Sequence, residues 1–423
     1  MDFYRKFAVT ALTFSFMLGA CGAKPLTPRD EYDLWLKQLK TEMAARGISE
    51  KTLRKAFAQD YYHENPEVVK IDRRQPEFAL TSTDYLNRVI TAKRVEEARH
   101  RYRELLPFLK LLQKKYGVQP EYIIAFWGVE TNFGRQFGNF EVINVLTTLS
   151  YDRRRPKFFR EQLFQALQIM DKWSIEPEQM QGSWAGAMGH FQFMPGTFNA
   201  YAVDYNNDGK IDIWHSFEDA AASAANYLSS IGWRKNEPWG IVVTLPWNFD
   251  FNQAGRSRSK TIAEWQKLGI RALGKRKLNL PLDARASLIL PEGKKGRAYL
   301  IMDNFRTIMK WNRSENYALA IGTLADYIKS EQKWQPAVDD PAVRVKTDDV
   351  LKIQAFINKL GWGKLEEDGQ LGSQTRAAIQ KVQSEARLPA DGYPDYRLLQ
   401  KINNYNPEIG FAVPVQPRKK TVK

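Results

Sequence analysis

One carboxylate lies in an apolar stretch of the sequence, FWGVETNFG (126–134). Helical spacing places Phe126 one turn before Glu130 on the same face, with Trp127 three residues before it. A carboxyl group among apolar side chains holds its proton to higher pH than one in water, as a general acid must. The alternative is a glutamate at a helix end that points to solvent. The stretch makes Glu130 a candidate general acid. Whether its carboxyl group is enclosed or points to solvent depends on the elements around it.

The elements around this stretch are predicted to be mostly helical as far as about residue 235. Segment 106–130 has the pattern of two helices interrupted by Gly117 and Pro120, so Glu130 falls near the end of the second. Short strands with Pro and Gly turns are predicted between about 240 and 300. Further helices are predicted for 32–47, 158–173, 220–233 and 316–330. The sequence therefore predicts a mainly α fold with a small β insertion.

A second unit follows a linker rich in Pro and Asp, 335–344. Residues 345–404 have the pattern of two or three short helices around Asp-Gly turns, and 405–423 form a basic tail. The whole chain has a net charge of +15, which favours a polyanionic environment or simply a solvated basic surface. Its basic runs are scattered and no nucleic-acid motif accompanies them. Nucleic acid is therefore not an expected partner.

The amino terminus has the pattern of an export signal, residues 1–20. Arg5 and Lys6 precede an apolar run that is too short to span a bilayer as a helix, and small residues follow it. The ending Leu-Gly-Ala-Cys resembles a bacterial lipobox, in which Cys21 would become lipid-modified. Gly22 after it points to the outer membrane, facing the periplasm. The alternative is an ordinary cleaved signal in which Cys21, the single cysteine of the chain, is incidental.

Four motifs in order give the chain a family resemblance. GVETNFG, LSYDRRRPKFFREQL (149–163), SWAGAMGHFQFMPGTF (183–198) and ANYLSSIGW (225–233) resemble the membrane-bound lytic murein transglycosylases of the B type, over nearly all of residues 30–333. The second unit, with DGQLGSQTRAAIQKVQ followed by LPADG, resembles the small helical peptidoglycan-binding domain. It departs from that pattern at Val382, where an aromatic residue is usual. The resemblance implies a lysozyme-like catalytic domain at 21–334 and a three-helix peptidoglycan-binding domain at 345–404.

The resemblance also implies the chemistry. Such enzymes cleave the glycan between N-acetylmuramic acid and N-acetylglucosamine, and the 6-hydroxyl of the muramic acid attacks its own anomeric carbon. Most glycosidases need two carboxylates, but this reaction needs no activated water, so Glu130 alone can give a proton and then take one. Asp152 and Glu141 are the nearest other carboxylates in sequence, and neither has a comparable apolar setting. No cofactor is required for this chemistry.

The family's motifs assign further residues to the substrate. Hydrogen-bonding and sugar-stacking roles are implied for Ser183, Gln192, Tyr227 and Tyr317, and binding of peptide or lactyl carboxylates for Arg154 and Arg155. The structural alternatives are turn and cap chemistry for Ser183, core packing for the two tyrosines, and exposed surface positions for the two arginines.

Segment DYNNDGKID (204–212) matches the opening of a calcium-binding loop. The usual closing glutamate is absent, since His215 occupies that position; Glu218 or Asp219 would have to close the shell, and the resemblance favours Asp219. A simple turn is the alternative to a structural calcium site. Its candidate ligands are Asp204, Asn206, Asp208, the carbonyl of Lys210, and Asp219.

The sequence thus predicts a periplasmic lipoprotein that cuts peptidoglycan strands. Its expected partners are those strands, the outer membrane through a lipid anchor, and cell-wall synthesis or remodelling proteins. Two alternatives remain open: a hydrolytic muramidase of the same fold, and a wall-binding scaffold without turnover.

Overall fold

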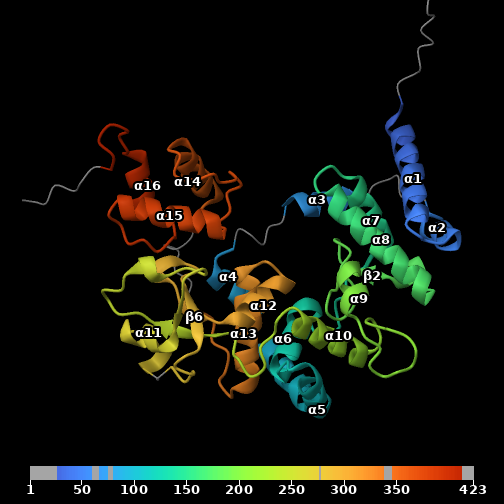
Figure 1. Cartoon of the computed structure of the whole chain (residues 1–423), viewed down its shortest axis with the longest axis horizontal. Coiled ribbons are helices and arrows are strands. Elements are labelled where there is room, and N and C mark those ends of the chain that lie inside the picture. Colours follow the sequence, from blue (N-terminus) through green and yellow to red (C-terminus); the bar gives the residue numbers. More distant parts are fainter. Residues whose placement is uncertain (1–25, 60–65, 75–79, 276–277, 338–344, 412–423) are drawn as a thin grey trace, which may run out of the picture. The chain divides into compact units, whose positions relative to one another are not determined.

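The computed structural model describes residues 26–59, 66–74, 80–275, 278–337 and 345–411 (Figure 1). The predicted export signal and Cys21 lie outside these residues, as do most of the predicted linker and of the basic tail. The chain divides into two compact units, Met1–Gly47 and Ile48–Lys423. In the first, α1 (Pro28–Ala45) begins with a capping box between Thr27 and Asp30. It confirms the helix predicted for 32–47.

The second unit begins with a run of helices that includes α6, the helix that carries Glu130. They are α2 (Glu50–Ala56), α3 (Pro66–Arg74), α4 (Ser82–Val89), α5 (Ala92–Tyr116), α6 (Pro120–Thr131), α7 (Val142–Tyr151), α8 (Pro156–Trp173), α9 (Pro195–Tyr201) and α10 (Phe217–Ser230). The predicted interruption between α5 and α6 is confirmed: Gly117 ends α5 with a φ of 79°, and Pro120 starts α6. A two-stranded ribbon, β1 (Phe140–Glu141) with β2 (Gln181–Gly182), joins the start of α7 to the segment that begins at Ser183.

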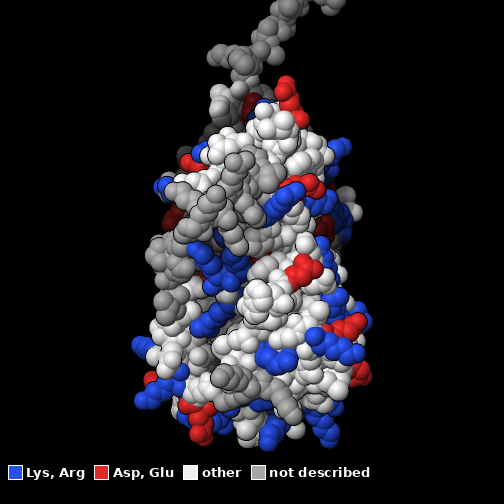
Figure 2. All heavy atoms as spheres, turned by 90° about the vertical axis from the view of Figure 1, so that its left-hand side faces the viewer, with Lys and Arg blue, Asp and Glu red and all other residues white. Residues whose placement is uncertain are grey.

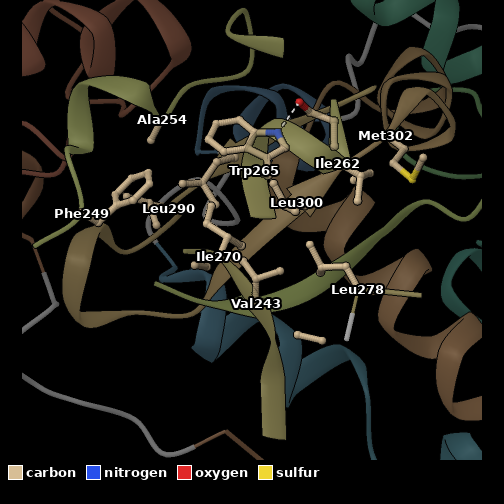
Figure 3. Packing of buried hydrophobic residues seen from close by; sticks show 14 residues of the cluster. Val243, Phe249, Ala254, Ile262, Trp265, Ile270, Leu278, Leu290, Leu300 and Met302 are labelled. Carbon is tan, nitrogen blue, oxygen red and sulfur yellow. Dashed lines mark hydrogen bonds between the residues drawn. The ribbon is translucent and has the colours of Figure 1, made fainter. Parts of the chain in front are cut away.

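The predicted β insertion is an antiparallel sheet with the strand order β4-β6-β7-β3-β5. Its strands are β3 (Gly240–Thr244), β4 (Ser259–Thr261), β5 (Arg271–Ala272), β6 (Arg285–Ile289) and β7 (Ala298–Ile301), with helix α11 (Ile262–Lys267) after β4. Trp265 of α11 is completely buried in the core of this insertion, and its indole N–H donates to the Ala286 carbonyl at 2.9 Å (Figure 3). The insertion therefore has an apolar core of its own.

Two helices follow the insertion. Helix α13 (Glu315–Lys329) confirms the predicted return to helix, whereas α12 (Asp303–Trp311) was not predicted. Helix α6 packs against both α5 and α13. Its residues from Ile123 to Phe126 are fully buried, which explains why α6 is apolar on all sides. The prediction of a mainly α fold with a small β insertion is confirmed.

The last part of the second compact unit, the C-terminal unit, consists of α14 (Thr347–Lys359), α15 (Ser373–Glu385) and α16 (Tyr396–Asn403) around a small apolar core. Val382, where the family pattern has an aromatic residue, is completely buried in this core. Two buried glutamines hold the Asp-Gly turns in the same way. Gln354 accepts the N–H of Gly369 and donates to Asp368, and Gln383 accepts the N–H of Gly392 and donates to Asp391.

The C-terminal unit also contacts the β insertion. The guanidinium of Arg376 donates to the Pro291 carbonyl at 2.7 Å, and the Asp391 carboxylate accepts the N–H of Lys294 at 3.0 Å. Gly293 lies between these contacts with a φ of +66°, and a Cβ at this position would lie 2.7 Å from that of Tyr393. Glycine is therefore required where the two parts meet.

One face of the molecule, shown in Figure 2, carries more Lys and Arg than Asp and Glu, in keeping with the net charge of +15. The basic side chains are spread over this face among uncharged ones, with acidic side chains between them. On this face the charge is dispersed and does not define a single binding surface.

Candidate active site

Helix α6 carries Glu130 from the buried interior to the edge of the core. The helix ends one residue later, where Asn132, Phe133 and Gly134 take successive positive φ values of 49°, 60° and 76°. This turn folds the Phe133 ring back over Gly128, where a Cβ would lie 2.7 Å from the ring. Glu130 itself is partly buried. Its carboxyl group is therefore held at the end of a helix that the core fixes over its whole length.

Two neutral donors from another part of the chain contact the Glu130 carboxyl group. The indole N–H of Trp311 donates to Oε1 at 3.0 Å, and the hydroxyl of Tyr317 donates to the same oxygen. Burial and the charge of Glu130 raise the pKa of Tyr317 well above its usual value, so its hydroxyl keeps its proton. The solvent-exposed alternative for Glu130 is wrong, because the carboxyl group is engaged by buried and half-buried aromatic residues.

The short connection between α12 and α13 positions these two donors beside Glu130. Trp311 is the last residue of α12 and Tyr317 lies in the first turn of α13. Ser314 caps α13 by accepting the N–H of Tyr317 at 3.2 Å, and Asn312 accepts the N–H of Ser314 at 3.2 Å. These local hydrogen bonds fix the short connection, so both side chains approach Glu130 from defined directions.

Aromatic rings surround the Trp311 indole. Its centre lies 4.6 Å from the Phe126 ring and 5.0 Å from the Tyr227 ring. The Phe193 ring lies 5.4 Å away and also contacts Tyr227 at 5.8 Å. The structure thus brings the predicted residues Glu130, Tyr227 and Tyr317 together around Trp311. Trp311 could not be predicted as a site residue, because its helix was not predicted and it lies 181 residues from Glu130.

Trp127 contacts a different group of residues. Its ring packs against Phe217 at 4.2 Å and Phe133 at 5.6 Å, and its N–H donates to Nδ1 of His190 at 2.9 Å. His190 is a second residue that the sequence did not single out. Burial lowers the pKa of His190 to about 4, so its ring is neutral near pH 7. Trp127 therefore anchors the segment that contains Gln192 and Phe193.

Ser183 and Gln192 both hold the backbone of this segment. Ser183 Oγ accepts the N–H groups of Ala185 at 3.3 Å and Ala187 at 3.1 Å. The Gln192 amide donates to the carbonyls of Phe137 at 3.1 Å and Gly189 at 3.2 Å. The turn chemistry considered for Ser183 is therefore present, and contact of either residue with a substrate stays a prediction.

Arg154 and Arg155 both bind one carboxylate of the protein, that of Asp72. Arg154 Nη1 lies 2.8 Å from Asp72 Oδ2, and Arg155 binds Oδ1 of the same group. Asp72 is 2% exposed, whereas the two arginine side chains are 42% and 40% exposed. Both arginine side chains are therefore partly exposed and also form ion pairs with Asp72. Their binding of substrate carboxylates stays a prediction.

Residues 204–216 form a tight loop that leads into α10, and Asp219 lies in the first turn of that helix. The Asp204 carboxylate accepts the N–H groups of Asp208 at 3.2 Å and Gly209 at 2.9 Å. Asp219 is fully buried, and its two oxygens accept the N–H groups of Tyr205 at 2.8 Å and Asp212 at 3.1 Å. Such oxygen donors suit calcium in type. In the described part of the chain, however, no three acidic, histidine or cysteine side chains are grouped so that they could hold a metal ion.

The comparisons with known proteins agree with this arrangement. Residues 31–326 match the family described as the transglycosylase SLT domain, and residues 346–402 match a peptidoglycan binding domain. The first match spans well over half of the chain, so the chain belongs to the transglycosylase SLT domain family. The expected lysozyme-like core with a C-terminal peptidoglycan-binding domain is thereby confirmed.

Three relatives show how far the similarity extends. The membrane-bound lytic murein transglycosylase B of Escherichia coli K12 is 33% identical over 221 residues, which cover 50% of this chain and 58% of that protein. SltB3 from Pseudomonas aeruginosa, crystallised with NAG-anhNAM-pentapeptide, has a TM-score of 0.82 and 39% identity, covering 88% of this chain and 99% of that one. The Escherichia coli lytic transglycosylase Slt35 in complex with calcium has a TM-score of 0.59 and 28% identity, covering 69% and 92%.

Proposed function

We propose that this protein is a lytic transglycosylase that cleaves the β-1,4 bond between N-acetylmuramic acid and N-acetylglucosamine in peptidoglycan, leaving 1,6-anhydro-N-acetylmuramic acid ends. The observation that carries the proposal is the Glu130 carboxyl group at the end of buried helix α6, with two neutral donors on one of its oxygens. The anhydro sugar bound to SltB3 is a product of this type, and family membership supports the same chemistry here.

In the proposed reaction Glu130 acts twice. Its acid form gives a proton to the glycosidic oxygen, and the bond from that oxygen to the anomeric carbon breaks while the N-acetyl group of the substrate assists. The carboxylate then takes the proton of the muramic acid 6-hydroxyl, whose oxygen bonds to the same anomeric carbon. Both reacting groups belong to one sugar ring, so orientation is largely provided by the substrate and no second carboxylate is required.

Tyr227 lies beside Trp311, so aromatic rings form one side of the site. Aromatic rings suit the apolar C–H surface of a sugar. Ser183 and Gln192 would reach the substrate from the segment that they also stabilise. Arg154 and Arg155 would meet substrate carboxylates with the part of each guanidinium that Asp72 leaves exposed.

A structural calcium ion would be held by Asp204, Asn206, Asp208, the Lys210 carbonyl and Asp219. The ion would link the loop to the start of α10 and would take no part in the reaction. The calcium complex of Slt35 supports this assignment in a relative of the same fold.

The protein acts in the periplasm as an outer-membrane lipoprotein anchored through Cys21, with cell-wall synthesis or remodelling proteins as candidate partners. The support is the lipobox-like ending of the export signal and the membrane-bound relative from Escherichia coli. Among the described residues, none of the helices is both long and apolar enough to cross a bilayer.

Substitution of Glu130 by glutamine tests the catalytic assignment. Glutamine keeps the size and much of the hydrogen bonding but can neither give nor take the proton, so digestion of purified peptidoglycan should slow by orders of magnitude. Binding to the polymer should survive. Glu121→Gln, which removes a carboxylate from the other end of α6, is the matched control and should retain activity. Wild-type activity of Glu130→Gln would overturn the assignment, and a wild-type protein without any turnover would favour the wall-binding scaffold.

A further inference from the structure

We propose that a second pocket, separate from the Glu130 site, binds a small zwitterion of the amino-acid class. Asp326 binds the ammonium group of this ligand and Lys110 binds its carboxylate. The pocket has a volume of about 410 Å³, which falls within the usual range for small-molecule sites. One of its lining residues is Glu121 at the start of α6, about 14 Å along the helix before Glu130.

Helices α5, α6 and α13 form the walls of this pocket, together with the loop between α10 and β3. The three helices pack against one another. Trp239, which is fully buried, joins α6 to α13: its backbone N–H donates to the Tyr122 hydroxyl at 3.0 Å, and its indole N–H donates to Oδ2 of Asp326 at 3.0 Å. Gln119 holds the loop by donating to the Glu237 carbonyl at 3.0 Å. The pocket is therefore preformed, and the Asp326 carboxyl group is held in place.

Four charged side chains line the pocket, and two of them neutralise each other. The Lys329 ammonium lies 3.2 Å from Oε1 of Glu121. The other two, Asp326 and Lys110, form no ion pair with any residue that the structure describes. A ligand that complements both must carry one positive and one negative group. A free amino acid is a small molecule that carries this pair of charges.

The Asp326 carboxyl group is suited to an ammonium group. Asp326 is accessible to solvent from the pocket, yet protein surrounds its carboxyl group on the other sides, and burial raises its pKa to about 7. Trp239 donates to Oδ2, whereas none of the described residues donates to Oδ1. Glu121 also raises this pKa and Lys329 lowers it. A bound ammonium would favour the ionised carboxylate and form a charge-assisted hydrogen bond with it.

The remaining walls suit the rest of an amino acid. Leu106 and Pro238 offer apolar surface to an aliphatic side chain. Gln113 and Asn236 line the same pocket, and their side-chain amides make no hydrogen bond to the described part of the chain. Burial and the charge of Glu121 raise the pKa of the Tyr102 hydroxyl, so that it stays protonated. These groups supply hydrogen-bond donors and acceptors beside the two charged residues.

Binding of norleucine tests the proposal, because this amino acid has an unbranched aliphatic side chain. Its Kd for the full-length protein would be measured at pH 8 by saturation-transfer NMR, beside hexylamine and hexanoate. These two compounds have the same number of carbon atoms, but each carries only one of the two charges. Norleucine should bind, and each single-charge compound should bind at least about tenfold more weakly, because it loses one charged hydrogen-bonded contact. Absence of norleucine binding, or equal binding of hexylamine or hexanoate, would overturn the proposal.

Variants assign the two charges to their residues. Asp326→Asn keeps an acceptor for the Trp239 indole and removes the charge, and Lys110→Met keeps the length of the side chain; each should weaken norleucine binding about tenfold. Lys114→Met, which removes a lysine of α5 that does not line the pocket, is the matched control and should bind like the wild type. Melting temperatures would show that the variants are folded. Unchanged binding in Asp326→Asn and Lys110→Met would overturn the proposal.

Glu130→Gln separates this pocket from the proposed active site. It should bind norleucine like the wild type, because Glu130 does not line the pocket. Loss of norleucine binding in this variant would place the ligand at the Glu130 site and overturn the inference. The proposed function is tested by turnover of peptidoglycan, so it can stand or fall independently of norleucine binding.

Discussion

His190 should make the stability of this protein sensitive to mild acid. Its Nδ1 accepts the N–H of Trp127 at 2.9 Å, and its ring lies 4.8 Å from the Phe137 ring. Protonation at Nδ1 would bring two donors face to face inside a half-buried aromatic cluster. Burial accordingly lowers the pKa to about 4, against an ordinary value of 6.5, while Asp212 opposes this effect and His215 adds to it.

The sign of the effect follows from proton binding. Between pH 6.5 and pH 4 the unfolded chain binds a proton at this histidine and the folded protein does not, so acid favours unfolding. The stabilisation is fully present above pH 6.5 and is lost as the pH falls towards 4. Each pKa unit corresponds to about 1.4 kcal/mol, so the full window corresponds to about 3 kcal/mol in the free energy of unfolding.

His190→Gln isolates this contribution, because glutamine can accept the N–H of Trp127 but does not titrate. Urea unfolding followed by circular dichroism at pH 7 and at pH 4.5 should show that the wild type loses about 2 to 3 kcal/mol more than the variant. His100→Gln, which removes an exposed histidine on α5, is the matched control and should keep the wild-type loss. Equal losses in wild type and His190→Gln would show that His190 does not cause the acid sensitivity.

Three further predictions concern the candidate calcium loop, the C-terminal unit and Cys21. Removal of calcium should lower the melting temperature without abolishing turnover, since an ion bound only by the folded protein stabilises it by mass action. Asp208→Ala should abolish this response. A wild-type melting temperature that does not change with calcium would mean that the segment is a simple turn. Truncation after Gln335 should leave a folded, active enzyme that is retained less by insoluble peptidoglycan. The reason is that a second binding unit raises the local concentration of the active site near the polymer. Equal pelleting of the full-length and truncated forms with sacculi would contradict this prediction. Cys21→Ala should yield soluble protein or uncleaved precursor, and an unchanged outer-membrane fraction would exclude the lipid anchor.

The apolar setting of Glu130 could be predicted from the sequence because it depends on neighbours along one helix. Phe126, one turn earlier, does support the site, through its contact with Trp311. Trp127 faces His190 instead, since three residues along a helix give a different direction from four. The donors on the carboxyl group could not be predicted in this way, because Trp311 and Tyr317 come from a joint between helices far along the chain.

The remaining residues show what motifs leave open. The family resemblance pointed to Ser183, but its hydroxyl oxygen accepts hydrogen bonds from two backbone N–H groups of its own turn. The Arg154 and Arg155 pair was matched to substrate carboxylates, and the carboxylate found beside it belongs to Asp72, a residue of α3 distant in sequence. A motif records which residue types recur, whereas their partners depend on how separate helices pack.

The identity of the product distinguishes a lytic transglycosylase from a hydrolase. Purified peptidoglycan would be digested with the wild-type protein and with Glu130→Gln, and the released muropeptides would be weighed by mass spectrometry. Wild-type products should end in 1,6-anhydro-N-acetylmuramic acid, lighter by one water than a hydrolysed end, and the variant should release almost none. Reducing ends as the main product would contradict this prediction, because water rather than the substrate's own hydroxyl would then be the group that attacks.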